Sequence, residues 1–479
     1  MTATITVAII YLGFLVAFAV WSRRETHTLA GFYLAGKKLP YWVVAFSTNA
    51  TGESGWLLLG LTGMGYAVGA QAYWVVVGEV TGVALSWLLV SRRLKRLSDD
   101  TDSITVPDVL ASRFADSWHL IRGIAVVIIL FMVTAYVSAQ MIATGKAVSS
   151  FIDIERDIAI YVGAAVIIGY TLVGGYKAVS YTDVLQGVLM LLGLVVVPVV
   201  AIGAAGGWGE VSSKLGAEDP GFLSMFSFTA DGMAGWVGII SFLAIGLPFL
   251  GVPQLLVRYM SARDDAELKK ARYVSVAVMF FFGVGAVTAG IAGRALYPGL
   301  EDTETIFPVL SSELFPPIAT GVLLVIVMSA IMSTVDSLLL LASSAVVRDT
   351  MQKMLGSQKS DHRLAIYGKI ATLLIGVMAI ALAFQVEALI FWFVLFAWSG
   401  LGAAFGPVAL CLLYYKGTTG AGVAAGMLGG FLTSVIWVLA FKDQAYGLYE
   451  ALPGFIVGFV VTLLVSAMTR TADPRLDYG

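Results

Sequence analysis

The chain has 479 residues, of which 59% are hydrophobic and only 13% are charged, and it contains 52 glycines. This composition excludes an ordinary soluble domain and indicates an all-α protein that crosses a membrane several times. The net charge of −2 is spread over loops and the chain has one cysteine, so we expect no nucleic-acid partner and no internal disulfide.

Apolar runs long enough to cross about 30 Å of hydrocarbon follow one another along the chain. An odd number of spans places the two termini on opposite sides of a lipid bilayer. We interpret residues 1–479 as one transmembrane domain with thirteen predicted helices, near residues 3–22, 40–66, 70–91, 119–149, 157–175, 182–205, 234–260, 272–297, 316–346, 366–386, 388–415, 419–441 and 447–469.

The loop charges predict the orientation of the chain. Every second loop is basic, and the intervening loops are acidic or uncharged. By the positive-inside bias, the N-terminus lies outside and the C-terminus lies in the cytoplasm. The basic loops contain Arg23, Arg24, Lys37, Lys38, Arg92, Arg93, Lys95, Arg96, Arg263, Lys269, Lys270, Arg348, Lys353, Lys359 and Arg363.

The second span is interrupted by polar and small residues between Ser47 and Trp56, and Glu53 lies among them. This stretch predicts an unwound helix that carries a binding site. An interrupted helix exposes free carbonyls, which suit a cation, and free amides, which suit a carboxylate. A zwitterionic solute together with Na⁺ would use both ends of the break.

Acidic residues inside the predicted spans are candidates for function, because a charge there costs at least about 2.5 to 3.5 kcal/mol on insertion scales. They are Glu53, Glu79, Asp183 and Asp336. For Glu79, in the third span, we favour a hydrogen bond between helices over a side chain that faces the site. Tyr136 and Gln140, in the fourth span, have two equally open roles, solute contact and packing.

A second interruption, with two prolines and two glycines, lies at residues 246–253 in the seventh span. Because it follows the first by five spans, it favours a five-plus-five inverted repeat with the binding site at the membrane midplane. The alternative is a simple proline kink. We assign 3–22 to an extra first helix, 40–205 to the first repeat, 234–415 to the inverted repeat and 419–469 to two C-terminal helices.

The ninth span carries hydroxyl groups at helical spacing. Ala330, Ser333, Thr334 and Ser337 share one helix face, and Asp336 borders it. Hydroxyls, carbonyls and a carboxylate can replace the water shell of a cation, so the pattern predicts a Na⁺ site. The alternative is that these hydroxyls bond carbonyls of their own helix and permit close packing.

The sequence contains no phosphate-binding loop, zinc-protease helix or nucleophile elbow. We therefore expect a carrier driven by an ion gradient, and no enzyme activity.

These residues form motifs that resemble those of the sodium:solute symporter family, most of all its bacterial sodium/proline symporters. The resemblance runs over nearly the whole chain, at residues 54–61, 170–175, 178–183, 251–260, 332–334, 397–407 and 447–455. It implies a LeuT-type fold of thirteen helices, a bacterial inner (plasma) membrane as the location, and a monomer as the sufficient unit.

The resemblance also implies the residues of the sites. The main Na⁺ site would use carbonyls of Ala50, Glu53 and Ala330 with the hydroxyls of Ser333 and Thr334. A second Na⁺ site would use Asp183, Ser333, Asp336 and Ser337. The expected solute contacts are Thr51, Gly52, Ser54, Gly55, Trp56, Tyr136, Gln140, Ile245, Phe249 and Pro253.

One departure from the proline-type pattern concerns the first break. Proline symporters carry aspartate then methionine where this chain has Gly52 then Glu53, and a shift by one residue turns a helical side chain by roughly 100°. Glu53 has three open roles: reaching Na⁺, meeting an amine of the solute, or carrying a proton.

In the seventh span, Ile245 and Phe249 replace an expected aromatic pair. We predict Na⁺-coupled import, by alternating access, of a small organic solute such as proline or a related amino acid or zwitterion. Two alternatives remain: an H⁺-coupled symporter that uses Glu53 and Asp183, and a membrane sensor that binds solute.

Overall fold

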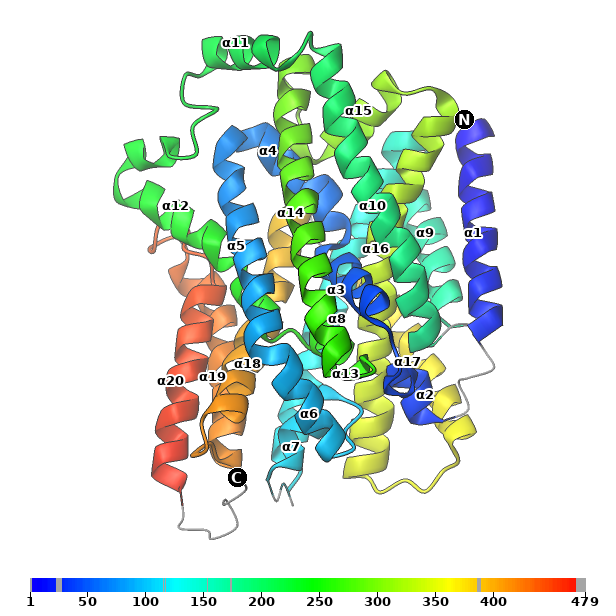
Figure 1. The fold of residues 1–479 in the computed structure, drawn as a ribbon, viewed down its shortest axis with the longest axis vertical. Coiled ribbons are helices and arrows are strands. Elements are labelled where there is room, and N and C mark those ends of the chain that lie inside the picture. The colour runs from blue at the N-terminus through cyan, green and yellow to red at the C-terminus, as the bar shows by residue number, and fades with distance from the viewer. Residues whose placement is uncertain are drawn as a thin grey trace.

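The computed structural model describes residues 2–22, 28–114, 116, 118–152, 154–172, 175–385 and 389–470. Within these ranges the regular structure is helical, apart from one isolated bridge between Leu39 and Ala262. The helices pack into one bundle, with α1 (Thr2–Ser22) at one edge and α20 (Ala451–Thr469) at the opposite edge (Figure 1). Arg23, Arg24 and part of the motif at 170–175 lie outside the described residues.

The first half of the chain forms the helices that precede the second break. They are α2 (Leu29–Leu34), α3 (Tyr41–Gly55), η3 (Trp56–Leu61), α4 (Thr62–Val68), α5 (Tyr73–Leu85), η5 (Ser86–Ser91), α6 (Arg92–Asp100), α7 (Val106–Ser112), α8 (Leu120–Ile152), α9 (Arg156–Thr171), α10 (Tyr176–Ala204) and α11 (Trp208–Glu218).

The second half contains the second break and the C-terminal pair. Its helices are α12 (Met233–Ala244), η7 (Leu247–Leu250), α13 (Pro253–Ser261), α14 (Asp265–Leu296), η8 (Thr303–Thr305), α15 (Ile306–Leu314), α16 (Pro317–Ser344), η9 (Ala345–Met354), α17 (Asp361–Ala383), α18 (Ile390–Tyr414), α19 (Gly420–Ile436), η10 (Trp437–Phe441) and then α20.

The helices follow the predicted spans, although the number thirteen stays a prediction. Among the described residues, 10 helical stretches are long and apolar enough to cross a membrane. One of them, Tyr41–Asp100, is 60 residues long and covers two predicted spans, which meet at Gly69, where φ is +63°. The repeat boundaries likewise stay a prediction.

Both predicted helix interruptions are present. In α3 the break is confined to Ser54, whose φ of 58° and ψ of −172° lie outside the helical region. This conformation is rare for a residue other than glycine, and strain of this kind tends to occur at functional sites. In the seventh span, α12 ends at Ala244, a short 3₁₀ turn follows in η7, and Pro253 then starts α13 after the extended Val252.

Glycines on the neighbouring helices hold the second break in place. A Cβ atom on Gly246 would lie 1.9 Å from the carbonyl oxygen of Gly78 on α5, and one on Gly402 of α18 would lie 2.3 Å from the Cβ of Pro248. A larger residue would not fit at either contact, so α5 and α18 pack closely against the second break.

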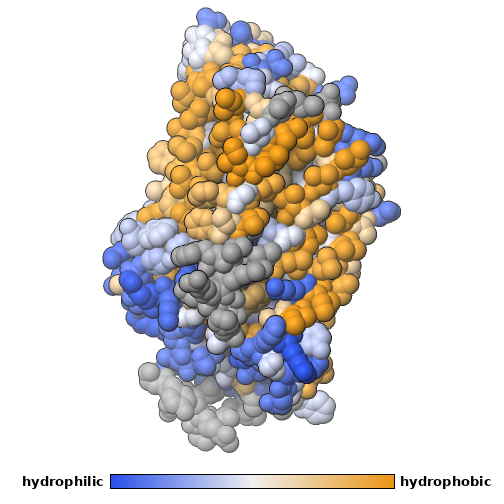
Figure 2. Space-filling view, turned by 90° about the vertical axis from the view of Figure 1, so that its right-hand side faces the viewer, coloured by the Kyte–Doolittle hydropathy of each residue, from blue (hydrophilic) through white to orange (hydrophobic). Residues whose placement is uncertain are grey.

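The surface has the pattern of a membrane protein. Figure 2 shows a broad hydrophobic belt with hydrophilic surface towards the ends of the molecule. Side chains such as Ile10, Met378 and Leu464 are 66%, 60% and 59% exposed, as lipid-facing residues would be. The start of α1 and the end of α20 lie at opposite ends of the bundle, and the basic helix α6 lies at the end where α20 finishes (Figure 1).

Candidate functional site

Two hydroxyl groups of α16 face the backbone carbonyls of α3, just before its break. The Ser333 hydroxyl donates to the Ala50 carbonyl at 2.9 Å, and the Thr334 hydroxyl donates to the Thr51 carbonyl at 3.0 Å. Both also lie within hydrogen-bond reach of the Ala330 carbonyl, at 3.0 and 3.4 Å. All five residues are fully buried. We call this group the α3–α16 oxygen cluster.

Neutral oxygens in this number suit a hard cation of low charge, because they can replace its water shell without requiring deprotonation. The cluster brings together four of the five residues expected at the main Na⁺ site. The fifth, Glu53, has its carbonyl hydrogen-bonded to the N–H of Trp56. The Thr51 carbonyl, which the sequence did not assign to this site, contacts Thr334 instead. The alternative of purely local bonding does not account for the two bonds that cross between helices.

A second polar group lies next to this cluster, around Asp183 of α10. Its Oδ2 accepts the Ser47 hydroxyl at 2.6 Å and lies 3.3 Å from Nη2 of Arg258. The same Nη2 donates to Thr51 Oγ1 at 2.8 Å and contacts Ser337 Oγ. Asp183 and Arg258 are 0% and 1% exposed, so this is a buried ion pair inside the bundle.

Arg258 is a residue of this group that sequence reasoning missed. It lies near the basic loop after the seventh span, where an arginine is expected to mark the cytoplasmic side of the membrane. In the structure its side chain instead turns into the bundle, and its Nη1 also donates to the Gln254 carbonyl at 2.8 Å. The positive charge therefore lies among residues expected to bind a second Na⁺. Of the signals in the sequence, only its position inside the motif at 251–260 could have pointed to it.

Asp336 does not join the other three residues proposed for the second Na⁺ site. Its Oδ1 accepts the Thr171 hydroxyl of α9 at 2.6 Å, while its Oδ2 has no partner among the described residues. Ser333 and Ser337 do meet, because the Ser337 hydroxyl donates to the Ser333 carbonyl at 2.8 Å. Asp336 borders the hydroxyl face because it lies three positions after Ser333, and in the structure its side chain points towards α9.

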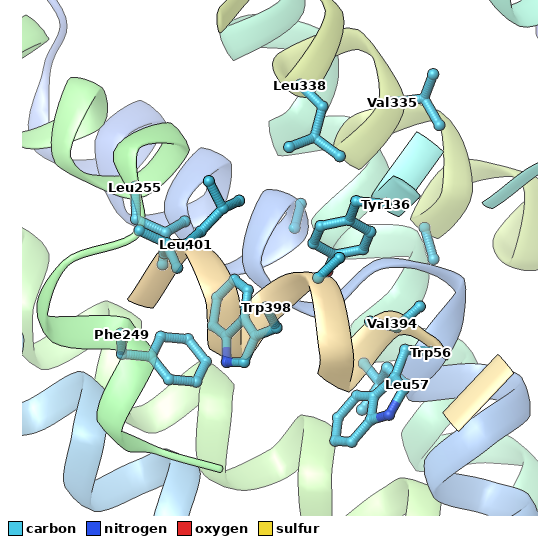
Figure 3. Packing of buried hydrophobic residues seen from close by; sticks show 14 of the residues in the cluster. Trp56, Leu57, Tyr136, Phe249, Leu255, Val335, Leu338, Val394, Trp398 and Leu401 are labelled. Carbon is cyan, nitrogen blue, oxygen red and sulfur yellow. The ribbon is translucent and has the colours of Figure 1, made fainter. Parts of the chain in front are cut away.

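Aromatic side chains from three helices converge beside the two breaks. Figure 3 shows Trp398 of α18 between Phe249 and Tyr136. Its ring centroid lies 4.9 Å from that of Phe249 and 6.4 Å from that of Tyr136, and its indole N–H donates to the Ile245 carbonyl at 3.2 Å. Trp398 is a second residue that the prediction left out, although it lies in the motif at 397–407.

The break in α3 borders this aromatic group. A Cβ on Gly52 would lie 3.3 Å from the Phe249 ring. The Gly55 N–H donates to Gln140 Oε1 at 3.0 Å. Of the ten expected solute contacts, these bring Gly52, Ser54, Gly55, Tyr136, Gln140, Ile245 and Phe249 together. Thr51 bonds Arg258, and Pro253 begins α13.

Several buried polar atoms at this break have no partner among the described residues. They are both carboxylate oxygens of Glu53, the indole nitrogen of Trp56 and the amide nitrogen of Gln140. Buried polar groups are nearly always hydrogen-bonded, and an unpaired one costs about 1 to 3 kcal/mol. The residues at this break therefore include both unpaired donors and unpaired acceptors.

The start of α18 and η8 lie beside the first break. The Trp56 ring stacks on Phe391 with centroids 5.3 Å apart. Glu304 of η8 accepts the backbone N–H groups of Ile390 and Phe391 at 3.1 and 2.8 Å, and it pairs with Lys146 of α8 at 2.6 Å. These bonds fix the start of α18 above the break.

An ion-pair network closes the opposite, basic end. Arg122 of α8 lies 2.7 Å from both Asp108 of α7 and Asp349 of η9, and Arg348 pairs with Asp108 at 2.9 Å. Burial alone would raise the pKa of Asp108, but the charges of Arg348 and Arg122 outweigh it and hold that pKa below its ordinary value. The network therefore ties three helices together while Asp108 is ionised.

Comparisons with known proteins identify the family of this chain. A model of the sodium:solute symporter family matches residues 32–430. The chain is 36% identical over 452 residues to a high-affinity proline transporter, PutP, of Bacillus subtilis, covering 93% of this chain and 94% of the relative. It is 35% identical over 474 residues to a sodium/proline symporter of Staphylococcus aureus, covering 96% of this chain and 92% of that relative.

Solved structures share the fold. A substrate-bound, outward-open Na⁺-coupled sialic acid symporter superposes with a TM-score of 0.82 at 18% identity, over 98% of this chain and 99% of the other. The transporter Mhp1 of the nucleobase-cation-symport-1 family, in a closed conformation, gives a TM-score of 0.54 at 14% identity, over 93% and 96%. The predicted LeuT-type fold is thereby confirmed. The chain belongs to the sodium:solute symporter family.

Proposed function

We propose that this protein is a Na⁺-coupled symporter that carries proline, or a closely related zwitterionic amino acid, by alternating access. The observation that supports it most directly is the α3–α16 oxygen cluster, in which Ser333 and Thr334 meet the carbonyls next to the helix break. The names of the relatives at 36% and 35% identity favour proline over other solutes.

In this mechanism Na⁺ is co-transported cargo that binds to the oxygen cluster. By contacting both α3 and α16, the ion fixes the broken helix and orders the adjacent solute pocket. Each ligand then tightens the other, because the coupling free energy between two sites is reciprocal. When the basic end opens, low Na⁺ there lets the ion leave, and the solute is released.

The membrane placement is part of the proposal. We infer a bacterial inner membrane with the N-terminus outside and the C-terminus in the cytoplasm. Support comes from the basic residues of α6, which lie at the end of the bundle where α20 finishes (Figure 1). A monomer contains the whole oxygen cluster and the whole aromatic pocket, so we propose that one chain suffices.

A thermal-shift experiment on the purified protein tests the function. The midpoint of unfolding is measured with amino acids, betaines and monocarboxylates, in Na⁺ and again with K⁺ in its place. A ligand that binds only the folded state raises this midpoint. We expect L-proline to raise it in Na⁺ and to have little effect in K⁺. A proline effect that ignores Na⁺ but follows pH would instead favour the H⁺-coupled alternative.

A further inference from the structure

A second buried carboxylate lies close to Glu53. Glu79 of α5 is 3% exposed, and its Oε2 has no partner among the described residues. Both residues lie beside the second break. A Cβ on Gly52, next to Glu53, would lie 3.3 Å from the Phe249 ring, and Gly78, next to Glu79, packs against Gly246. We call these two residues the Glu53–Glu79 pair.

The fold places each carboxylate at one of the two helix breaks. Glu53 directly precedes Ser54, the strained residue of the first break. Glu79 follows Gly78, whose carbonyl touches the second break, and a Cβ on Gly246 would lie 3.3 Å from the Glu79 backbone nitrogen. Each member of the pair therefore lies next to one of the two breaks.

In the described part of the chain, no basic side chain forms an ion pair with Glu53 or Glu79. The buried arginine of the bundle, Arg258, pairs with Asp183. Burial without a cation disfavours the charged form of a carboxylate. A ligand that brings a positive group would stabilise that charged form and give the unpaired acceptors a partner.

Two unpaired hydrogen-bond donors lie near the first break. Trp56 is 3% exposed and its indole N–H is free, and the free amide nitrogen of Gln140 lies on the same break. These two donors can receive a carboxylate, as the free amides at an interrupted helix can. The residues around the breaks therefore offer acceptors, which suit a charged nitrogen, and donors, which suit a carboxylate.

We propose that the Glu53–Glu79 pair is the subsite that binds the positively charged nitrogen of the solute. This inference rests on the proposed function and deepens it, because it makes a cationic nitrogen the feature by which the protein selects its solute. It also gives Glu79 a role at the site, in place of the packing role that the sequence favoured.

A pair of matched ligands tests this subsite. L-Proline and tetrahydrofuran-2-carboxylate have the same ring and carboxylate, but the second has an ether oxygen in place of the charged nitrogen. Binding of both is measured in Na⁺ for the wild type, Glu53→Gln, Glu79→Gln and, as a control, Glu267→Gln. Glu267 is an equally buried glutamate that bonds the Tyr41 N–H and Arg263, away from the pocket.

We expect the wild type to prefer proline, and each pocket variant to lose about 10- to 100-fold of that preference, since bonds to charged groups contribute about 1.5 to 3 kcal/mol. Glu267→Gln should keep it. The thermal transition of each variant without solute shows that it is folded. The inference is overturned if the pocket variants keep the full preference, or if they change only the Na⁺ dependence measured without solute.

Failure of the proposed function would look different. The wild type itself would then show no Na⁺-dependent binding of proline, and that result would overturn this inference as well.

Discussion

At the scale of single residues, two hydroxyl groups determine the geometry of the proposed ion site. Ser333 and Thr334 each reach across to a carbonyl of another helix, at 2.9 and 3.0 Å, although each could bond only within α16. A serine or threonine that bonds two helices at once positions its oxygen for a third partner. Ser344, near the end of the same helix, shows the ordinary case, since within the described residues its hydroxyl bonds only the Leu341 carbonyl of α16.

Removing these hydroxyls should weaken Na⁺ binding without unfolding the protein. For Ser333→Ala and Thr334→Ala we expect the Na⁺ concentration for half-maximal proline uptake to rise about tenfold or more, because each loses one oxygen ligand. Uptake as a function of Na⁺ measures this. Ser344→Ala is the matched control, and an unchanged Na⁺ dependence in Ser333→Ala would show that the ion binds elsewhere.

The Arg258–Asp183 pair should behave as a buried ion pair. Removing one partner leaves a buried charge unpaired, at a cost of about 3 to 5 kcal/mol, whereas removing both costs much less. We therefore expect the thermal midpoint to fall in Arg258→Met and in Asp183→Asn, and to recover in part in the double variant. Additive losses in the double variant would contradict a direct pairing.

At the scale of helices, the second break depends on close backbone contact. Gly402 of α18 leaves room for Pro248 of η7, whereas a Cβ on Gly429 of α19 would lie 3.5 Å from Val461, an ordinary contact distance. The close contact between α18 and η7 fixes the positions of Ile245 and Phe249. It therefore determines the shape of the proposed solute site.

Two glycine-to-alanine variants distinguish the effect of the α18–η7 contact from that of general helix packing. Gly402→Ala would place a methyl group 2.3 Å from Pro248, so η7 must shift, and we expect a large loss of proline affinity. Gly429→Ala adds the same methyl group at ordinary contact distance and should keep wild-type affinity. Equal affinities in the two variants would mean that the position of η7 does not shape the pocket.

The ion-pair network at the basic end makes a prediction about pH. The pKa of Asp108 is lowered in the folded protein, so its contribution is present above its ordinary pKa, near 3.8, and is lost as the pH falls through the lower folded value. Asp108→Asn should therefore lower the thermal midpoint at neutral pH.

The difference between wild type and Asp108→Asn should shrink below about pH 4. Thermal unfolding of both proteins from neutral to acidic pH measures it. A difference that stays constant into the acid range would show that the carboxylate charge is not what ties α7 to α8 and η9.

At the scale of the whole molecule, the sequence was most informative where polarity conflicts with the membrane. Polar residues at 47–56 and prolines at 246–253 predict both breaks, and the spacing of Ser333 and Thr334 predicts the hydroxyl face. Features that depend on side-chain direction were not predictable. Arg258 turns inward from a basic end, Asp336 turns towards Thr171, and Trp398 reaches two helices that are distant in sequence.

Glu53 and Glu79 show the same limit. Each alone had more than one open role, and they lie 26 positions apart in the sequence. The packing of α5 against the second break, which places Glu79 beside it, cannot be read from the sequence. Function here depends on how the breaks meet, and periodicity along one helix carries no information about that.

The whole molecule should couple two gradients through these breaks. The most direct measurement is uptake of labelled L-proline into proteoliposomes that contain K⁺ and are diluted into Na⁺ buffer. We predict accumulation above the outside concentration that requires the inward Na⁺ gradient and stops when an ionophore dissipates it. Equal accumulation with K⁺ on both sides, or accumulation driven by a pH gradient without Na⁺, would contradict Na⁺-coupled proline symport.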